Sequence, residues 1–268
     1  MSNYPFRLLS TGFRDCYYNM SLDEALLESA AGNISSDNSA GLPVLRFYGW
    51  NPPAVSIGYF QDLAEEVDLE AVKRYGFDLV RRVSGGGAVL HRSELTYSII
   101  VGLNHPLAGK NLDESYRILC RGLIHGLALL GIESVFSGTN DILTGGKKIS
   151  GNAQTRRMNC LLQHGTILLD NDVETMFGVL KAPKEKNKGK LIGQIRERVT
   201  SLRSILGREI NFVEAEKAFT RGFSEALNIE LHNTDVTPAE ESRALELAET
   251  KFKTREWLVN KKINTDRS

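Results

Sequence analysis

One stretch of the sequence is most informative about the fold: Arg81-Arg82-Val83-Ser84-Gly85-Gly86-Gly87-Ala88-Val89-Leu90-His91. Its two arginines end a strand-like run at 77–82, and its glycines come directly after that run. Three consecutive glycines let the backbone approach a ligand closely and turn successive N–H groups toward an anion. The neighbouring guanidinium can neutralise a phosphate. No Gly-Lys-Ser/Thr follows, so this is not a Walker loop, and the spacing is not that of a dinucleotide fingerprint. The stretch predicts a phosphate-binding loop after a strand; a glycine-rich turn beside two surface arginines is the alternative.

A second glycine-rich segment, Gly145 to Ala153, contains two adjacent lysines. The pair of glycines that opens it suits the positive φ angles of a hairpin turn between two short strands. Side chains alternate along a strand, so Lys147 shares a face with Ile149, and Lys148 shares the other with Ser150. Only one lysine can then face a pocket, where it would hold a carboxylate or a phosphate as a point charge. Two solvated lysines on a hairpin are the alternative.

Two histidines lie in or beside apolar strand-like runs, His91 and His164. A hydrogen-bonded structural histidine is common in such a place. No HExxH or Cys/His spacing surrounds either residue, so we expect no metal site made by protein ligands alone. Cys160 precedes His164 by four residues and would share its strand face, which suggests a reactive thiolate. A small buried cysteine is the alternative.

The rest of the chain predicts one α+β domain with mostly antiparallel strands and interspersed helices. A helix at about 21–31 would have Ser21 as its N-cap and Glu24 at the capping-box position. Another, at about 238–251, would begin in the same way at Thr237 with Glu240. Further helices are predicted at about 68–75, 112–130 and 211–226, and strands at about 44–48, 54–59, 77–82, 95–101 and 161–169, with a hairpin near 141–150.

Composition excludes several classes of protein. The 268 residues are 41% hydrophobic and 25% charged, and 33 Lys+Arg balance 33 Asp+Glu, which excludes a disordered or disulfide-stapled chain. Zero net charge gives no general reason to expect nucleic acid or membrane binding. With no visible signal peptide, no long apolar stretch and three widely spaced cysteines, we expect a cytoplasmic protein. The lysine-rich segment Lys181 to Lys190 predicts a mobile surface loop.

Taken in order, these motifs resemble one known superfamily. The glycine loop, then Ser137-Gly-Thr-Asn140-Asp141-Ile, then Gly146-Lys-Lys148-Ile-Ser-Gly-Asn-Ala and His164-Gly165 are similar to the lipoate-protein ligase and octanoyltransferase branch of the biotin/lipoate ligases. The likeness runs from Asn19 to Trp257. It implies a mixed, largely antiparallel sheet with flanking helices, related to biotin ligases and class II synthetases, in a single catalytic domain over residues 1–268.

The resemblance also implies a reaction and a site. Ligases of this kind convert lipoate and ATP, with Mg²⁺, to lipoyl-adenylate and pyrophosphate. They then acylate a lysine of a lipoyl carrier domain, such as a 2-oxoacid dehydrogenase E2 subunit or the glycine cleavage H protein. Lys148 would hold the activated carbonyl and the α-phosphate as the catalytic residue. The substrate and ATP site would comprise Arg82, Ser84, Gly85, Gly86, Gly87, Ala88, Val89, Leu90, His91, Asn140, Asp141, Lys148, Gly151, Ala153, His164 and Gly165.

Two features of the chain bear on whether it resembles the ligases or the octanoyltransferases more. By the resemblance, octanoyltransferases pass the acyl group from acyl carrier protein through a cysteine in the loop before the Gly-Lys-Lys segment. Here that loop, 135–145, has no cysteine, so we expect an ATP-dependent ligase. Many ligases carry a small C-terminal accessory domain, which we expect to be absent here, and a separate accessory subunit would then supply it. The alternatives are an octanoyltransferase or lipoyl amidotransferase, and a non-catalytic module that binds lipoate or a carrier domain.

Overall fold

A large mixed sheet forms the centre of the computed structural model, which describes residues 4–34, 41–181 and 197–262. Its strand order is β11-β1-β2-β6-β10-β9-β8-β7. The pairs β11–β1 and β1–β2 are parallel, and the other five are antiparallel. The strands are β1 (Tyr4–Arg14), β2 (Val44–Trp50), β6 (Glu94–Gly102), β7 (Val135–Ser137), β8 (Asp141–Thr144), β9 (Lys147–Arg157), β10 (Cys160–Leu168) and β11 (Ile229–Asn233).

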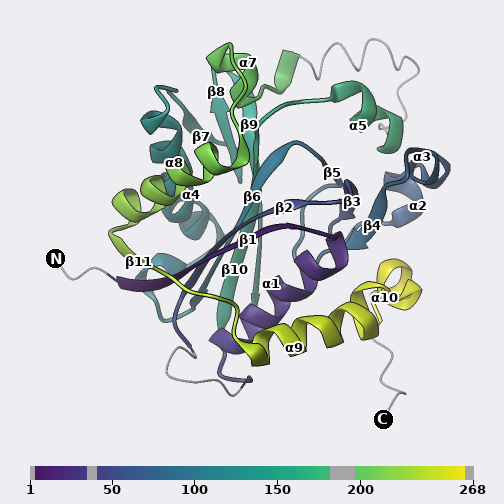
Figure 1. The fold of residues 1–268 in the computed structure, drawn as a ribbon, viewed down its shortest axis with the longest axis horizontal. Coiled ribbons are helices and arrows are strands. Elements are labelled where there is room, and N and C mark those ends of the chain that lie inside the picture. The colour runs from purple at the N-terminus through teal and green to yellow at the C-terminus, as the bar shows by residue number, and fades with distance from the viewer. Residues whose placement is uncertain (1–3, 35–40, 182–196, 263–268) are drawn as a thin grey trace.

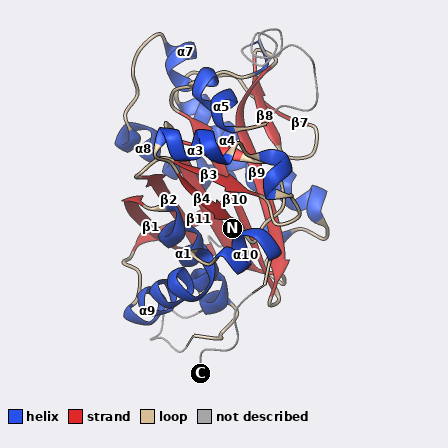
Figure 2. Cartoon of the chain, turned by 90° about the vertical axis from the view of Figure 1, so that its right-hand side faces the viewer, coloured by secondary structure: helices blue, strands red, loops and turns tan. Residues whose placement is uncertain are grey.

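Helices cover both faces of this sheet (Figure 1). Helices α4 and α8 pack together over one face, and α1 and α9 pack together over the other. Figure 2 shows α1 and α9 side by side. Strand alternation explains the two cores: in β6, Tyr97 and Ile99 enter the α4/α8 core, whereas Ile100 enters the α1/α9 core. The helical segments are α1 (Cys16–Ala30), α2 (Leu63–Glu66), α3 (Leu69–Tyr75), η1 (Pro106–Ala108), α4 (Leu112–Leu129), α5 (Val173–Val179), α7 (Leu202–Leu206), α8 (Phe212–Leu227), α9 (Pro238–Leu247), η2 (Ala248–Phe252) and α10 (Arg255–Asn260).

A second, three-stranded sheet carries the glycine loop. Its order is β4 (Asp78–Arg81), β3 (Ala54–Ile57) and β5 (Val89–His91), so the loop connects its two outer strands. Arg81 is fully buried and donates to the carbonyl oxygens of Gly58, Tyr59, Gln61 and Leu258 at 2.8–3.0 Å. It therefore fixes the neighbouring backbone. The alternative interpretation, a glycine-rich turn beside two surface arginines, is wrong for Arg81 because this residue is buried.

The expected fold class is confirmed, as are the hairpin and the capping box of α9. Gly145 and Gly146 have φ of 53° and 76° between β8 and β9. Thr237 Oγ1 accepts from the Glu240 N–H at 3.3 Å, and Glu240 Oε2 accepts from the Thr237 N–H at 2.9 Å. Within the described residues, no helix combines the length and hydropathy that crossing a membrane would need. Of the predicted loop at 181–190, all but its first residue lies outside the described ranges.

The expected start of the first helix is wrong. Helix α1 begins at Cys16, and Asp15 is its N-cap, with a carboxylate that accepts from the Tyr18 N–H at 2.8 Å. Ser21 lies inside the helix and donates to the Tyr18 carbonyl oxygen at 3.0 Å. Ser21 and Glu24 have capping-box spacing, but the residues before them are already helical. Local pattern alone misplaced the start of the helix by about one and a half turns.

Candidate functional site

A cavity of about 290 Å³ lies where β9, β10, the glycine loop and α1 meet. This volume is near the roughly 300 Å³ at which small-ligand pockets begin. Apolar side chains line much of it, including Met20, Trp50, Leu90, Leu168 and Met176. Cationic and polar groups converge on the same space, which is the arrangement that small-molecule sites share.

Most predicted site residues line this cavity. They are Arg82, Gly86, Gly87, Ala88, Val89, Leu90, His91, Asn140, Lys148, Gly151, Ala153, His164 and Gly165. Three predicted residues, Ser84, Gly85 and Asp141, do not line it, although each contacts one that does. Sequence reasoning missed Met20, Tyr48, Trp50, Thr96, Ser150, Asn152, Thr166, Leu168, Met176 and Val199. Of these, only Ser150 and Asn152 lie within a quoted motif.

Lys148 is the lysine that faces the cavity, as strand alternation predicts. Its ammonium lies 2.7 Å from Asp141 Oδ1, and its side chain is 40% exposed. Lys147 is exposed and does not line the cavity. A Cβ on Gly151 would lie 2.8 Å from Lys148 Nζ, so glycine is needed for the lysine to lie across that part of β9. The Lys148 carbonyl accepts from the Thr200 N–H at 2.9 Å, which fixes the backbone beside the ammonium.

Arg82 ties the glycine loop to a buried relay. Its guanidinium donates to the carbonyl oxygens of Gly85 and Gly87, both at 2.9 Å, and to Ser56 Oγ at 2.6 Å. Burial lowers the Arg82 pKa to about 10. No ion pair in the described parts of the chain includes Arg82, so a buried positive charge borders the cavity without a carboxylate partner. This charge favours a negatively charged or strongly polar ligand.

His91 continues the relay. Its Nε2 lies 2.7 Å from Ser56 Oγ and its Nδ1 lies 2.6 Å from Glu94 Oε1. The ring stacks on Trp50 with a centroid separation of 3.8 Å. Burial lowers the His91 pKa, although the Glu94 carboxylate opposes the shift. A neutral His91 accepts from Ser56 and donates to Glu94, which satisfies every group in the relay.

His164 belongs to a second buried relay. Its Nε2 lies 2.6 Å from Ser84 Oγ, and its Nδ1 lies 3.1 Å from Asp23 Oδ2. Asp23 also accepts from Arg46 at 2.8 Å and from the Tyr48 hydroxyl at 3.0 Å. Burial opposes ionisation of Asp23, but the His164 hydrogen bond and the Arg46 charge lower its pKa overall. Both ring nitrogens of His164 are therefore occupied, and Asp23, which is not among the predicted site residues, fixes the ring against the cavity.

The glycine loop also offers backbone donors. No hydrogen bond within the described residues has the N–H of Gly85, Gly86, Gly87 or Ala88 as its donor. Gly86 has φ of 91°, a conformation that L side chains rarely adopt. Gly86, Gly87 and Ala88 line the cavity together with Lys148 and Arg82, so positive charge and backbone N–H groups without a partner among the described residues border it. Such an arrangement can stabilise an oxyanion that forms during acyl transfer.

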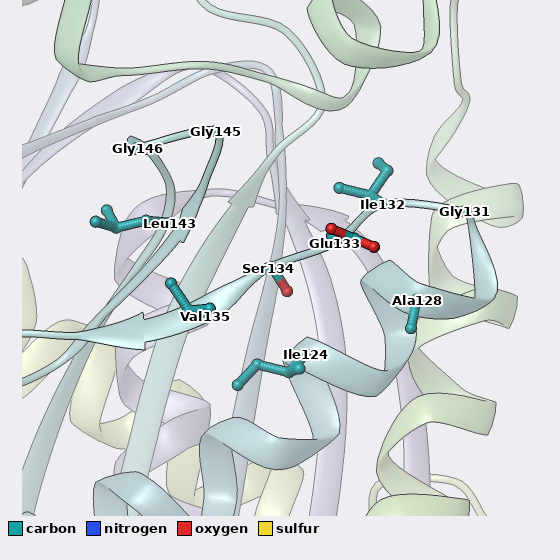
Figure 3. Close-up of a pocket in the computed structure, with 10 residues that line it drawn as sticks. All are labelled: Ile124, Ala128, Gly131, Ile132, Glu133, Ser134, Val135, Leu143, Gly145 and Gly146. Carbon is teal, nitrogen blue, oxygen red and sulfur yellow. The ribbon is translucent and has the colours of Figure 1, made fainter.

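The chain's other features contribute less to this site. Cys160 is 2% exposed and lies outside the cavity, and burial raises its pKa, which favours the buried-cysteine alternative. A second hollow, of about 640 Å³, lies between the end of α4 and the β8–β9 turn (Figure 3). None of the predicted site residues lines it, and Glu133 is its one charged lining residue. Across residues 4–34, 41–181 and 197–262, no three His, Cys, Asp or Glu side chains are grouped to hold a metal.

Comparison with known proteins identifies the family. Residues 15–224 match the lipoyl protein ligase A/B catalytic domain. Octanoyltransferase LipM of Geobacillus kaustophilus is 38% identical, with 96% of this chain and 99% of that protein covered. The same enzyme from Anoxybacillus flavithermus is 37% identical over the same shares.

Solved structures show the same fold. A bi-partite lipoate protein ligase and its E2 lipoyl domain from Thermoplasma acidophilum include a chain with a TM-score of 0.83, 32% identity and 97% coverage of both chains. Lipoate-protein ligase A bound with ATP has a TM-score of 0.78 and 30% identity, covering 96% of this chain and 99% of that one.

These relatives correct the expected function. We expected an ATP-dependent ligase, but relatives matched over nearly their whole length are octanoyltransferases, so that expectation is wrong and the alternative is better supported. The feature that misled is the absence of a cysteine from the loop at 135–145. In the structure this segment forms β7, the turn after it and β8, and the Asn140 side chain donates to the Asn152 carbonyl oxygen. The family match, the relatives and the fold agree, and the chain belongs to the lipoyl protein ligase A/B catalytic domain family.

Proposed function

We propose that this protein is an octanoyltransferase, which moves an octanoyl group from acyl carrier protein to a lysine of a lipoyl carrier domain. The relatives named octanoyltransferases support the donor. One observation carries the acyl-transfer chemistry: a single cavity joins apolar walls to the Lys148 ammonium and to glycine-loop residues whose N–H groups have no partner among the described residues. Apolar walls suit a saturated acyl chain. The charge and dipoles suit a carbonyl oxygen that becomes negative during transfer.

Each cavity element has a role in this reaction. Met20, Trp50 and Leu90 contact the acyl chain and exclude water from it. Lys148 donates to the carbonyl oxygen, while Asp141 keeps the ammonium in place. Arg82 holds the Gly85 and Gly87 carbonyls, so that the loop N–H groups keep their direction before the substrate arrives.

The proposal changes the expected cofactors and partners. A thioester is already activated, so the reaction needs neither ATP nor Mg²⁺, and octanoate takes the place of lipoate. The accessory subunit was expected for adenylation and has no part in the reaction. The acceptors we propose are the lipoyl domains of 2-oxoacid dehydrogenase E2 subunits and the glycine cleavage H protein. The T. acidophilum ligase described together with an E2 lipoyl domain supports this class of acceptor.

We further propose that residues 1–268 form one catalytic domain that works in the cytoplasm. The three cysteines, Cys16, Cys120 and Cys160, are free and buried, which suits a reducing compartment.

The test is the intact mass of an apo lipoyl domain after incubation with this protein and octanoyl-acyl carrier protein, without ATP. We expect the lipoyl domain to gain one octanoyl group. The parallel reaction with lipoate and Mg-ATP should leave it unmodified. If the octanoyl donor yields no product on a lipoyl domain that a known octanoyltransferase does modify, the proposal fails.

A further inference from the structure

We infer that Tyr97 is a positioning residue of this site: its hydroxyl group, on the face of the sheet away from the cavity, fixes the turn that carries Asn140 and Asp141, and through it the Lys148 ammonium. The inference rests on the proposed function, because it assigns a role in the same site. It adds a residue that does not line the cavity.

Tyr97 lies behind the floor of the cavity. Its side chain is fully buried in the α4/α8 core, whereas the preceding residue, Thr96, lines the cavity. Alternation along β6 places these two side chains on opposite faces of the sheet. Burial raises the pKa of Tyr97 well above its usual range, so the hydroxyl keeps its proton and can donate a hydrogen bond.

The Tyr97 hydroxyl orients a buried amide that holds the turn. It donates to Asn152 Oδ1 at 2.6 Å. Asn152 Nδ2 donates to the Asn140 carbonyl oxygen at 2.8 Å, and the Asn152 N–H donates to the same oxygen at 3.1 Å. The Asn140 side chain donates back to the Asn152 carbonyl oxygen. Because the hydroxyl fixes the oxygen of the amide, it also fixes the direction in which the amide nitrogen donates.

A glycine leaves room for this contact. Gly165 of β10 is paired in register with Tyr97 on one side and with Asn152 on the other. A Cβ on Gly165 would lie 2.1 Å from Asn152 Oδ1. The middle residue of the row therefore has no side chain, and the two outer side chains meet above its backbone. Any side chain at Gly165 would displace the amide that holds the turn.

The turn reaches the site at two points. Asn140 lines the cavity, and Asp141, which opens β8, lies 2.7 Å from the Lys148 ammonium. Asp141 is paired across the strands with Gly151, over which the lysine side chain lies. A shift of the turn would therefore move the carboxylate and the ammonium together. Displacements of about 1 Å in catalytic groups are enough to slow a reaction substantially.

A run of buried hydrogen bonds supports the hydroxyl from behind. Gln163 Nε2 donates to the Tyr97 hydroxyl oxygen at 2.5 Å. Gln154 Nε2 donates to Gln163 Oε1 at 2.5 Å, and Ser115 Oγ of α4 donates to Gln154 Oε1 at 2.9 Å. All of these bonds point the same way, so each polarises the next. The run connects a rigid helix to the turn, with the Tyr97 hydroxyl as its link across β6 and β9.

Tyr97→Phe tests the inference, because it removes the hydroxyl and keeps the ring. We expect kcat for octanoyl transfer to fall about tenfold, as for the loss of one buried hydrogen bond, with KM for both substrates within about twofold. The matched control is Tyr116→Phe, at a buried tyrosine of α4 whose hydroxyl interacts with the Gln154 backbone. Its kcat should stay within about twofold of the wild-type value. A folded Tyr97→Phe variant as active as the control would overturn the inference.

A double variant separates positioning from a general loss of structure. If Tyr97 acts through Lys148, then Tyr97→Phe should lower kcat by less than about twofold when Lys148→Ala is already present. Losses that multiply would overturn the inference, because they would mean that the two residues act independently. If circular dichroism shows that Tyr97→Phe does not fold, Gln163→Met replaces it in the same cycle, since it removes the donor to the Tyr97 hydroxyl.

A readout without activity keeps this inference apart from the proposed function. In protein with ¹³C-labelled lysine, the Lys148 Cε resonance is identified by its absence from Lys148→Ala. It should move in Tyr97→Phe by more than it moves in Tyr116→Phe, and equal positions in the two variants would overturn the inference. If the unmodified protein makes no octanoylated lipoyl domain, the proposed function has failed, and this resonance still decides whether Tyr97 positions Lys148.

Discussion

At the scale of single residues, the two adjacent lysines of β9 allow the catalytic role proposed for Lys148 to be tested against an effect of surface charge. We predict that Lys148→Ala lowers kcat for octanoyl transfer by roughly 10²–10³-fold, since it removes a charge aimed at the developing oxyanion. Lys147→Ala, one residue away on the exposed face, should stay within about twofold. Steady-state rates with both variants check this. Equal losses would mean that the positive charge of the hairpin matters but the face of the strand does not.

The sequence was informative about residues where geometry is periodic. Alternation along a strand was enough to separate Lys148 from Lys147, and the glycines of the loop marked a close backbone approach. It was uninformative where two residues far apart in the sequence meet only in the folded chain. Asp23 lies in the middle of helix α1, yet it contacts His164 of strand β10 and fixes its ring. Trp50 likewise reaches the cavity only because β2 lies beside β6.

At the scale of elements, the start of α1 can be tested directly. Asp15→Ala removes the side chain that accepts from the Tyr18 N–H, and we predict a loss of about 1 kcal/mol in the free energy of unfolding. For a chain of this size that is roughly a 2–4 °C fall in Tm. Ser21→Ala, at the position that the sequence pattern favoured, removes only a bond within the helix and should change Tm by less. The reverse order in thermal unfolding would place the N-cap at Ser21.

Two physical causes explain why the sequence did not predict three of the strands. Strands β5 and β7 have three residues each, too few for alternation to register. Strand β1 is long, but its apolar residues occur in short pairs. It is held by two parallel neighbours, β2 and β11, which come from distant parts of the chain. Long, periodic elements such as α4 and α8 were predicted to within a residue or two, because their own sequence carries the signal.

At the scale of the whole molecule, the ordered motifs identified the family and not its branch. The cavity residues suit an acyl chain with a polar carbonyl, and that requirement is the same whether the activating group is an adenylate or a thioester. What distinguishes the branches is the donor, and the feature we used for it, a missing loop cysteine, concerns the route of transfer. Relatives named octanoyltransferases favour a thioester donor over an adenylate.

The stability of the whole chain should depend on pH through its buried relays. Burial lowers the pKa of His91, which faces Ser56, Glu94, Arg82 and Trp50, so the folded protein keeps this ring neutral at a pH where the unfolded chain binds a proton. The unfolded state then holds more protons below about pH 6.5, and stability falls as pH decreases, by up to about 1.4 kcal/mol per pH unit for one group. Urea midpoints between pH 7.5 and 5.5 measure this slope. His91→Gln should flatten it in part, because burial also lowers the pKa of His105, which keeps its own contribution. An unchanged slope in the variant would mean that His91 binds a proton as readily in the folded protein as in the unfolded chain.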